Sequence, residues 1–266
     1  MRSDALVPAS ALTRVAADAP GWRPGLRSEG EVAHHSEVFA SGRETSGAAV
    51  ALALAADAVA EMDDTRALLW VQDRAALKLG GRPYRPGLPR AWRNRVIHVI
   101  AEKAEDALFA IEEGLRCRDL ATVVGEIAGN PKALDFTASR RLTLAAERHG
   151  VPLWLVRLDA ARDLSSARMR WDVRAAPSQH PRWNAAAPGA PAWRAELFRA
   201  RAHPPGEWVL GEESSGRLQA LRDEPSRSLS LSSGRTGGVE KSLLPFPVRP
   251  EEGLKPKAEG LSRRTS

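Results

Sequence analysis

The sequence predicts an α/β fold with a mostly parallel sheet, helices on both faces, and antiparallel strands near the C-terminal end. Short apolar runs of strand length, such as residues 67–72 and 95–101, alternate with longer segments of helical periodicity. Residues 168–175 and 193–201 instead alternate apolar with charged side chains, which is typical of strands with one solvated face. Alternating strands and helices imply right-handed crossovers within one sheet.

The predicted elements follow one another in a regular order. A strand-like run at 35–40 precedes an alanine-rich helix at 48–61, and a strand at 95–101 precedes a helix at 104–118. Gly150 stands in the usual place just past a helix end. The other expected elements are strands at 67–72, 121–124, 151–158, 168–175, 193–201 and 207–210, and a helix at 139–149.

The chain divides into three stretches. Residues 1–34 are of mixed composition and are predicted to form an N-terminal leader or a short helix. Residues 35–211 carry the strand–helix pattern and form the expected globular domain. Residues 212–266 are rich in Ser, Gly, Arg and Pro and almost free of aromatic residues. Such a segment buries too little apolar surface to offset its ordering entropy, so a disordered tail is expected.

Composition excludes several classes of protein. The single Cys117 excludes an intramolecular disulfide framework and a cysteine-rich zinc site, and it fits a reducing cytosol. The six histidines show no metal-ligand spacing, so no metal site is expected. The longest apolar run, residues 48–56, is too short to span a bilayer. The net charge of +6 is compatible with nucleic-acid binding but does not establish it.

A glycine loop between the first strand and the first helix is the most informative motif. A phosphate-binding loop has Gly, four residues, then Gly-Lys-Ser/Thr. Gly42 and Gly47 have this spacing, but Ala48 stands at the lysine position and Ala49 at the Mg²⁺-binding hydroxyl position. The pattern predicts a degenerate loop that does not hydrolyse ATP efficiently. The alternative is a chance pair of glycines before a helix.

The order of these segments resembles RecA, and more closely the RecA-related ImuA family. The resemblance covers residues 35–211 and is carried by HSEVFASGRETSGAAVALALA, LDFTASRRLTLAAERHGVPLWLVR and PGAPAWRAELFRARAHPPGEWVL. It implies a RecA-like three-layer core. It also implies an accessory protein of bacterial SOS-type mutagenesis and translesion DNA synthesis, without catalytic activity and without a cofactor. Weak ATP binding through backbone amides stays open.

The resemblance also assigns expected roles to individual residues. Gly42 and Gly47 match the glycines of the nucleotide cradle. Asp73 matches the glutamate that activates water, although its side chain is one carbon shorter; the alternative is a solvated strand end. Tyr84 matches an aromatic residue that stacks on adenine, or it packs on the loop prolines. Either Gly125 or Glu126 falls where an aspartate would help to hold Mg²⁺.

Two groups of arginines are candidates for contact with DNA or with a partner protein. Arginine interleaved with aromatic residues suits phosphate contacts and base stacking, whereas the same composition also suits a solvated loop or an acidic partner. On a sheet face, such arginines are equally well explained as solvated side chains. The candidates are Arg82, Arg85, Arg90, Arg93 and Arg95 beside Tyr84 and Trp92, and Arg168 and Arg170 further along the chain.

Partners are implied by the resemblance alone. They are RecA, an ImuB-type Y-family polymerase homologue and an error-prone DnaE-type polymerase, with single-stranded DNA as the alternative ligand for the arginines. The implied location is the cytoplasm, on the nucleoid after DNA damage. The competing interpretations are a RecA-type DNA-dependent ATPase or recombinase, which Ala48 and Ala49 oppose, and a RecA-like inhibitor of cell division.

Overall fold

The structure of the chain is a computed structural model. It describes residues 34–61, 64–88, 90, 92–178, 181, 184, 187–201, 205–212 and 218–221. The expected N-terminal leader, apart from His34, and the expected tail beyond residue 221 lie outside the described residues. Among the described helices, none combines the length and the apolar character needed to cross a bilayer.

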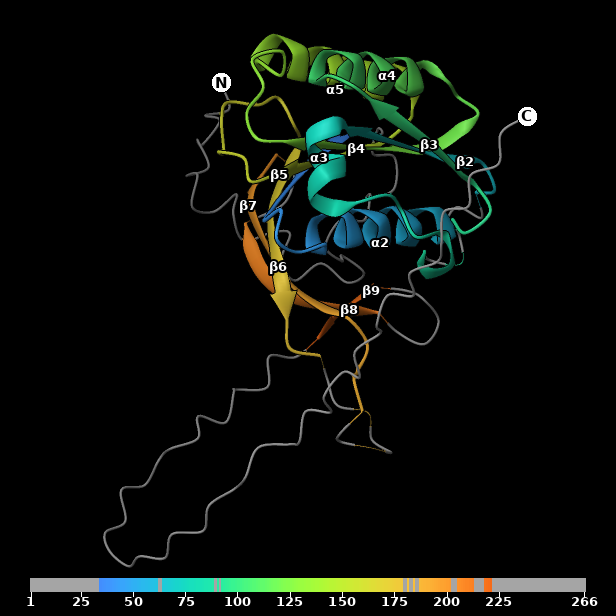
Figure 1. Ribbon diagram of the computed structural model, residues 1–266, viewed down its shortest axis with the longest axis vertical. Helices are drawn as coiled ribbons and strands as arrows, with labels where there is room; N and C mark the ends of the chain where they lie inside the picture. Colours follow the sequence, from blue (N-terminus) through green and yellow to red (C-terminus); the bar gives the residue numbers. More distant parts are fainter. Residues whose placement is uncertain are drawn as a thin grey trace, which may run out of the picture. The chain divides into compact units, whose positions relative to one another are not determined.

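Nine strands of the described residues form one sheet in the order β3-β2-β4-β5-β1-β6-β7-β8-β9 (Figure 1). Pairing is parallel from β3 through β6 and antiparallel from β6 through β9. The predicted fold class is confirmed. The strands are β1 His35–Ala40, β2 Ala67–Asp73, β3 Val96–Ala101, β4 Leu120–Ala128, β5 Leu153–Leu158, β6 Met169–Ala176, β7 Ala192–Ala200, β8 Gly206–Glu212 and β9 Leu218–Leu221.

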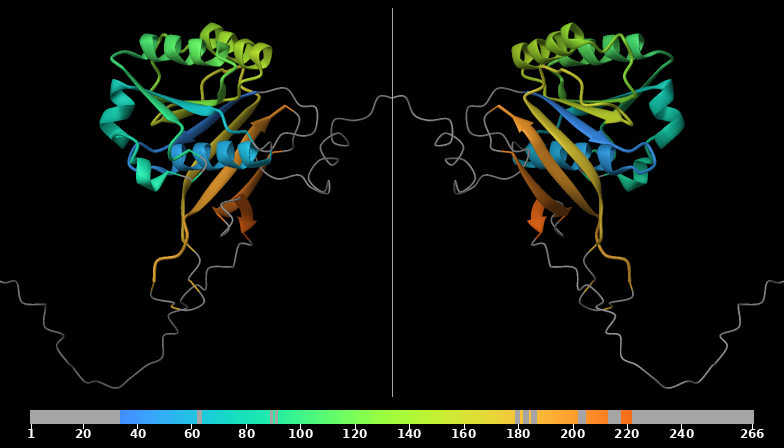
Figure 2. Two further views of the ribbon diagram at one scale, coloured as in Figure 1. Left: turned by 90° about the vertical axis from the view of Figure 1, so that its right-hand side faces the viewer. Right: turned by 90° about the vertical axis from the view of Figure 1, so that its left-hand side faces the viewer.

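Helices cover both faces of the parallel part of the sheet. Helix α2 lies on one face, and α4 and α5 lie side by side on the other (Figures 1 and 2). The short α3 and a single 3₁₀ turn, η1, fill the connection between β2 and β3. The bounds are α2 Ser46–Glu61, α3 Arg74–Gly80, η1 Arg85–Gly87, α4 Ala104–Arg116 and α5 Phe136–His149.

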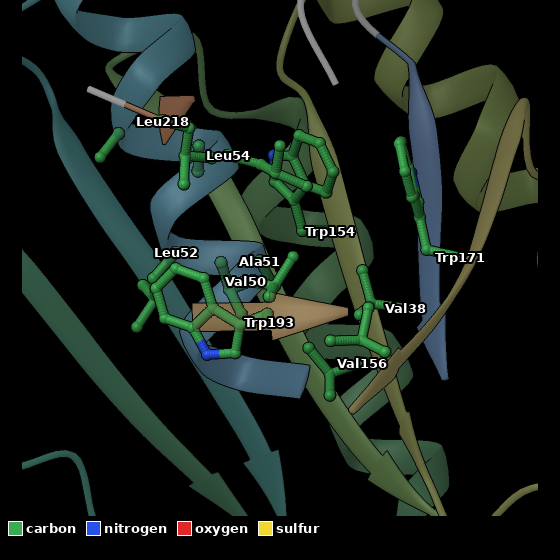
Figure 3. Close-up of a cluster of buried hydrophobic side chains, with 14 of the residues drawn as sticks. Val38, Val50, Ala51, Leu52, Leu54, Trp154, Val156, Trp171, Trp193 and Leu218 are labelled. Atoms are coloured by element: carbon green, nitrogen blue, oxygen red, sulfur yellow. The ribbon is translucent and has the colours of Figure 1, made fainter. Parts of the chain in front are cut away.

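Each face of the sheet has its own apolar core. On the α2 face, Trp154, Trp171 and Trp193 pack around α2, as Figure 3 shows. On the other face, Ile111 of α4 and Leu142 of α5 are buried against β4 and β5. Since β2, β4 and β5 contribute side chains to both cores, these strands need apolar residues at nearly every position. That requirement explains the continuous apolar runs in the sequence.

Capping residues fix where two helices begin and end. The Asp135 carboxylate accepts a hydrogen bond from the Ala138 amide at 2.7 Å, so α5 begins at Phe136, before the expected residue 139. At the other end Gly150 has φ of 73°, and its N–H donates to the Ala146 carbonyl, as predicted. Helix α3 was not expected; the Asp73 carboxylate caps it through the Ala76 amide at 2.6 Å.

The globular part of the chain extends beyond the expected boundary at residue 211. Strand β9 lies within the stretch that was predicted to be disordered, so that boundary is too early. Leu218 is buried in the core beside α2, and its amide donates to the buried Asp57 carboxylate at 3.3 Å. A four-residue strand is too short to give a clear periodic pattern, which is why the sequence did not reveal it.

Close packing at Gly47 gives a test of the fold. A Cβ at Gly47 would lie 2.8 Å from the Ala40 Cβ and 2.9 Å from Val156 Cγ1. Although Gly→Ala within a helix normally stabilises by roughly 0.5–1 kcal/mol, we expect Gly47→Ala to lower the free energy of unfolding by about 1–3 kcal/mol. Urea denaturation measures it. Gly80→Ala in α3 is the control, because its Cβ would meet only Glu126 Oε2 at 3.8 Å. An unchanged or higher stability of Gly47→Ala would contradict this packing.

Candidate functional site

The candidate site lies at the carboxyl ends of the central parallel strands, where open α/β sheets bind ligands. The loop of residues 41–45 follows β1, Asp73 ends β2, and Glu126 lies near the end of β4. Asp159 follows β5 directly. The fold therefore brings four polar or glycine-rich segments to one edge of the sheet. Only three of them were singled out from the sequence, since Asp159 was not.

The carboxylate of Asp159, just after β5, accepts a hydrogen bond from the first glycine of the loop. The Gly42 amide donates to Asp159 Oδ1 at 2.9 Å. Asp159 has φ of 49°, a left-handed conformation that turns the chain directly after β5. In a phosphate-binding loop, amides of this kind point at the anion. Here the bound anion is the protein's own side chain.

Two side-chain ends lie close to Gly42. A Cβ there would lie 2.6 Å from Asp159 Oδ2 and 2.8 Å from Leu79 Cδ1, but both belong to exposed, flexible side chains that can move aside. Gly47, by contrast, is required by the packing of α2 on β1 and β5. Packing therefore explains Gly47 without a phosphate, whereas the contacts near Gly42 do not require a glycine.

Two further amides of the loop, those of Arg43 and Glu44, form hydrogen bonds within it. The Ser41 Oγ accepts from the Arg43 amide at 3.2 Å, and the Ser41 carbonyl accepts from the Glu44 amide at 3.3 Å. Glu44 extends toward β6 and accepts from the Ala175 amide at 3.1 Å. Ala48 and Ala49 pack, partly buried, against the apolar core on the α2 face. Neither alanine offers a polar atom to a nucleotide or to Mg²⁺.

Asp73 acts as a helix cap. It is buried, and one carboxylate oxygen binds the first turn of α3 through the Ala76 amide. Burial raises the pKa of Asp73, while hydrogen bonds from the amides of Ala76, Ala128 and Ala75 act in the opposite direction. The expected alternative, a solvated strand end, is wrong for this residue. Its proposed match to a water-activating glutamate stays untested, but its oxygens already have backbone partners.

Glu126 lies at the centre of a buried hydrogen-bond network. Its Oε1 accepts from Trp70 Nε1 at 2.7 Å, and its Oε2 accepts from Gln72 Nε2 at 3.0 Å. Gln72 Oε1 in turn lies 2.8 Å from His98 Nε2 on β3. Burial raises the pKa of Glu126 to about 7, even though the bonds from Gln72 and Trp70 favour the ionised form.

Gly125 and Glu126 face opposite sides of β4. A Cβ at Gly125 would lie 2.5 Å from Ile111 Cδ1, so this glycine lets α4 approach the sheet and holds no ligand. Glu126 points instead to the side where Trp70 and Gln72 lie. Among the residues that the structure describes, no group of three or more His, Cys, Asp or Glu side chains is placed to hold a metal ion.

Tyr84 and three arginines of the β2–β3 connection lie in solvent. Tyr84 is 74% exposed, and its ring edge lies close to Gly87. Arg82, Arg85 and Arg90 are exposed. This segment therefore presents an aromatic side chain and positive charge at the surface. Whether it contacts DNA or a protein stays a prediction.

Arg93 and Arg95 both bond to the chain's own backbone. Arg93 Nη2 donates to the Leu88 carbonyl at 3.4 Å. Arg95 Nη1 donates to the carbonyl of Asp64 at 3.0 Å, and its guanidinium lies over the Trp92 ring, 5.7 Å from the centroid. Arg95 thus helps to hold the connection in place, whereas Arg93 is mostly exposed.

The two later arginines have structural partners. Arg168 forms an ion pair with Glu147 of α5. Arg170 is 4% exposed, and its Nε donates to Glu37 Oε2 at 2.7 Å. The expectation that Arg170 contacts DNA or a partner, or lies on a solvated face, is wrong. The residue lies at the centre of the sheet, beside β1, where the sequence pattern of alternating charges could not place it.

Over 197 residues the chain is 32% identical to Protein ImuA from two strains of Caulobacter vibrioides, a match that covers 68% of this chain and 75% of each relative. The chain belongs to the ImuA family. No family model matches it. The resemblance inferred from the sequence is therefore confirmed at the level of the family.

Several site residues of this ImuA-family chain escaped the sequence analysis. Asp159 and Gln72 had no motif to mark them, because a single Asp after a strand or a Gln inside one is common. Buried Glu37 was also missed, although a charged residue within an apolar strand is a usable signal. His98 was not singled out among the six histidines, and its link to Glu126 depends on two further strands.

The raised pKa of Glu126 predicts a pH-dependent stability. Between pH 4.5 and about 7 the folded chain holds a proton that the unfolded chain has lost, so stability falls as pH rises through this window and levels off above it. Glu126→Gln has no carboxyl to titrate at this position, so its stability does not fall with pH through this window for that reason. We therefore expect the stability of the variant relative to wild type to rise with pH, by up to about 1.4 kcal/mol per pH unit.

Urea denaturation at pH 5 and pH 8 measures this difference. Burial lowers the pKa of His35 to about 4, which gives the opposite trend, but His35 is present in both proteins and cancels. Glu105→Gln provides the control, because it makes the same change at an exposed position. A Glu126→Gln difference that does not change with pH would show that the buried carboxyl is not protonated.

Proposed function

We propose that this chain is a non-catalytic accessory protein of damage-induced mutagenesis. In this role it links RecA and an ImuB-type Y-family polymerase homologue to an error-prone DnaE-type polymerase during SOS-type translesion synthesis. Membership of the ImuA family supports the biological setting. The observation that carries the non-catalytic part is the Asp159 carboxylate on the Gly42 amide.

The occupied loop opposes ATP hydrolysis on electrostatic grounds. A bound phosphate would have to displace Asp159 and then remain close to its negative charge. The chain offers Ala48 and Ala49 where the lysine and the Mg²⁺-binding hydroxyl would stand. Phosphoryl transfer depends almost entirely on such positioning and charge. We infer that nucleotide turnover is not part of this protein's role.

An assembly role is compatible with the remaining features. A fold can serve as a binding surface when its chemistry resides in another protein. The surface offers exposed Arg82, Arg85 and Tyr84 near the edge of the sheet, and these side chains are suited to acidic partners or to single-stranded DNA. They support an adaptor more directly than an enzyme, because they lie outside any catalytic arrangement among the described residues.

The adaptor role predicts association without turnover. We expect the full-length chain to bind at least one of purified RecA, the ImuB-type protein and the DnaE-type polymerase of the same organism. ATP hydrolysis should stay at background with and without single-stranded DNA. Biolayer interferometry and a phosphate-release assay measure the two properties, with an unrelated basic protein as the control for charge. Absence of binding to all three proteins would overturn the proposal, and DNA-stimulated hydrolysis would favour a RecA-type ATPase.

The role assigned to Asp159 predicts when ATP can bind. The wild-type chain and Ala48→Lys/Ala49→Thr should both bind a fluorescent ATP analogue poorly, since the Asp159 carboxylate remains in place. Adding Asp159→Asn should tighten binding at least tenfold, because it removes the charge. Asn also tolerates the left-handed backbone at this position. If the double variant binds as tightly as the triple variant, Asp159 does not block the loop.

A further inference from the structure

Strand β3 ends the sheet and pairs with β2 alone among the described strands. The Arg95 carbonyl accepts the Leu68 amide at 2.8 Å, which sets the direction in which alternate peptide groups point. In a parallel pair, residues two apart bond to the same neighbour. The backbone N–H and C=O groups of Ile97 and Val99 therefore face β2. Those of Val96, His98 and Ile100 face outward, away from the sheet.

This edge lacks the features that normally prevent strand pairing. Proteins protect edge strands with charged side chains, proline, bulges or short length. Strand β3 reads Val-Ile-His-Val-Ile-Ala, with no Lys, Arg, Asp, Glu or Pro. Ile97 is 50% exposed, and every residue of the strand except Ala101 is partly or largely accessible. At the opposite end of the sheet, β9 has only four residues. The β3 edge is thus the longer and more apolar of the two.

Hydrogen bonds through Gln72 restrain the middle of the strand. His98 Nε2 lies 2.8 Å from Gln72 Oε1, and Gln72 Nε2 donates to Glu126. The middle of β3 is therefore fixed to the buried network at the centre of the sheet. A rigid edge loses little entropy when another strand pairs with it.

Exposed arginines lie before β3 in the chain, whereas the exposed carboxylates of Glu102, Glu105 and Asp106 follow its last residue. Arg82 and Arg85 belong to the connection between β2 and β3, and their charges, after burial, hold the pKa of His98 below its usual range. Exposed Arg93 precedes the strand by three residues. Among the described residues, none of these three arginines forms an ion pair with a carboxylate. A second copy of the chain would bring two such sets of arginines together, whereas an acidic segment would neutralise them.

We propose that the free edge of β3 docks an extended segment of a partner protein, which adds to the sheet as a strand. The segment carries apolar side chains at alternate positions, to cover Ile97 on one face, and acidic residues that meet Arg82, Arg85 and Arg93. The proposal goes beyond the accessory function, because it specifies a surface and an occupant. It does not require that any of the partners named above supply the segment.

Peptide backbone fits this edge better than nucleic acid does. The outward N–H and C=O groups of Val96, His98 and Ile100 alternate donor and acceptor at the spacing of another strand. Nucleic acid would use the arginines and Tyr84 but would leave those backbone groups and Ile97 without a partner. The edge and the arginines together therefore favour a protein segment.

Selection from a phage-displayed library of random nonapeptides on the immobilised full-length chain tests the proposal. We expect enriched peptides to alternate apolar residues and to carry Asp or Glu near their ends. Each is then synthesised in two forms, N-methylated on one set of alternate residues or on the other. Only one set faces β3, so one form should lose at least tenfold in affinity and the other should bind as the parent does.

Two pairs of variants locate the site. Ile100→Pro removes an outward N–H that takes no part in pairing with β2, whereas Ile100→Thr keeps it. Arg82→Glu/Arg85→Glu reverses the charge near the edge, and Arg140→Glu/Arg148→Glu makes the same change on exposed residues of α5. We expect peptide binding to weaken at least tenfold in Ile100→Pro and in Arg82→Glu/Arg85→Glu. The two control variants should bind as the unchanged chain does. The N-methylated peptides keep the test valid if Ile100→Pro does not fold.

The proposal is overturned if no peptide is enriched, if both N-methylated forms bind equally, or if the variants leave binding unchanged. Labelled oligothymidylate serves as the nucleic-acid probe. If it binds through Arg82 and Arg85 while no peptide does, the arginines serve nucleic acid and the strand-addition proposal fails. Because the test uses no named partner, its failure leaves the accessory function standing, and loss of the accessory function leaves a positive peptide result standing.

Discussion

The buried carboxylate of Glu37 holds together the two halves of the sheet. It accepts bonds from Arg170 Nε at 2.7 Å and Ser165 Oγ at 2.8 Å, and Arg157 Nη1 lies 3.8 Å away. These partners come from β5, from β6 and from the loop between them, so one charge joins the parallel and antiparallel parts. Removing either arginine alone would leave a buried charge incompletely compensated, which is strongly destabilising. The arrangement explains why Arg170 is unavailable for surface contacts.

The same ionic cluster is connected to the chain that leaves β5. Arg157 Nη2 donates to Asn130 Oδ1 at 3.0 Å, and that oxygen also accepts the Ala161 amide at 3.1 Å. The chain that leaves β5 is thereby anchored on both sides of its turn, and Asp159 lies on the Gly42 amide. The segment that carries Asp159 is therefore linked to β5 through Asn130. We infer that a change at Asp159 alone can release the amide without disturbing the fold around it.

A second buried network links the centre of the sheet to its edge. Glu126, Gln72 and His98 lie on three neighbouring strands and form a continuous line of hydrogen bonds from β4 to β3. Glu126, which falls where an aspartate was expected to help to hold Mg²⁺, takes part here in hydrogen bonds between strands. The β3 edge and the nearby exposed arginines form the surface for which we propose a partner.

The sequence by itself predicted the fold class, most of the elements in their order and the family, but not α3 or β9. Strand and helix periodicity are local properties, and so are the glycine after α5 and the missing lysine at Ala48. Only the tertiary structure decided that Asp159 occupies Gly42 from 117 residues away, that Glu37 meets Arg170 from 133 residues away, and that β3 is an edge strand. These contacts depend on which strands become neighbours. Strand order is set by the packing of the whole sheet, and no local pattern in the chain encodes it.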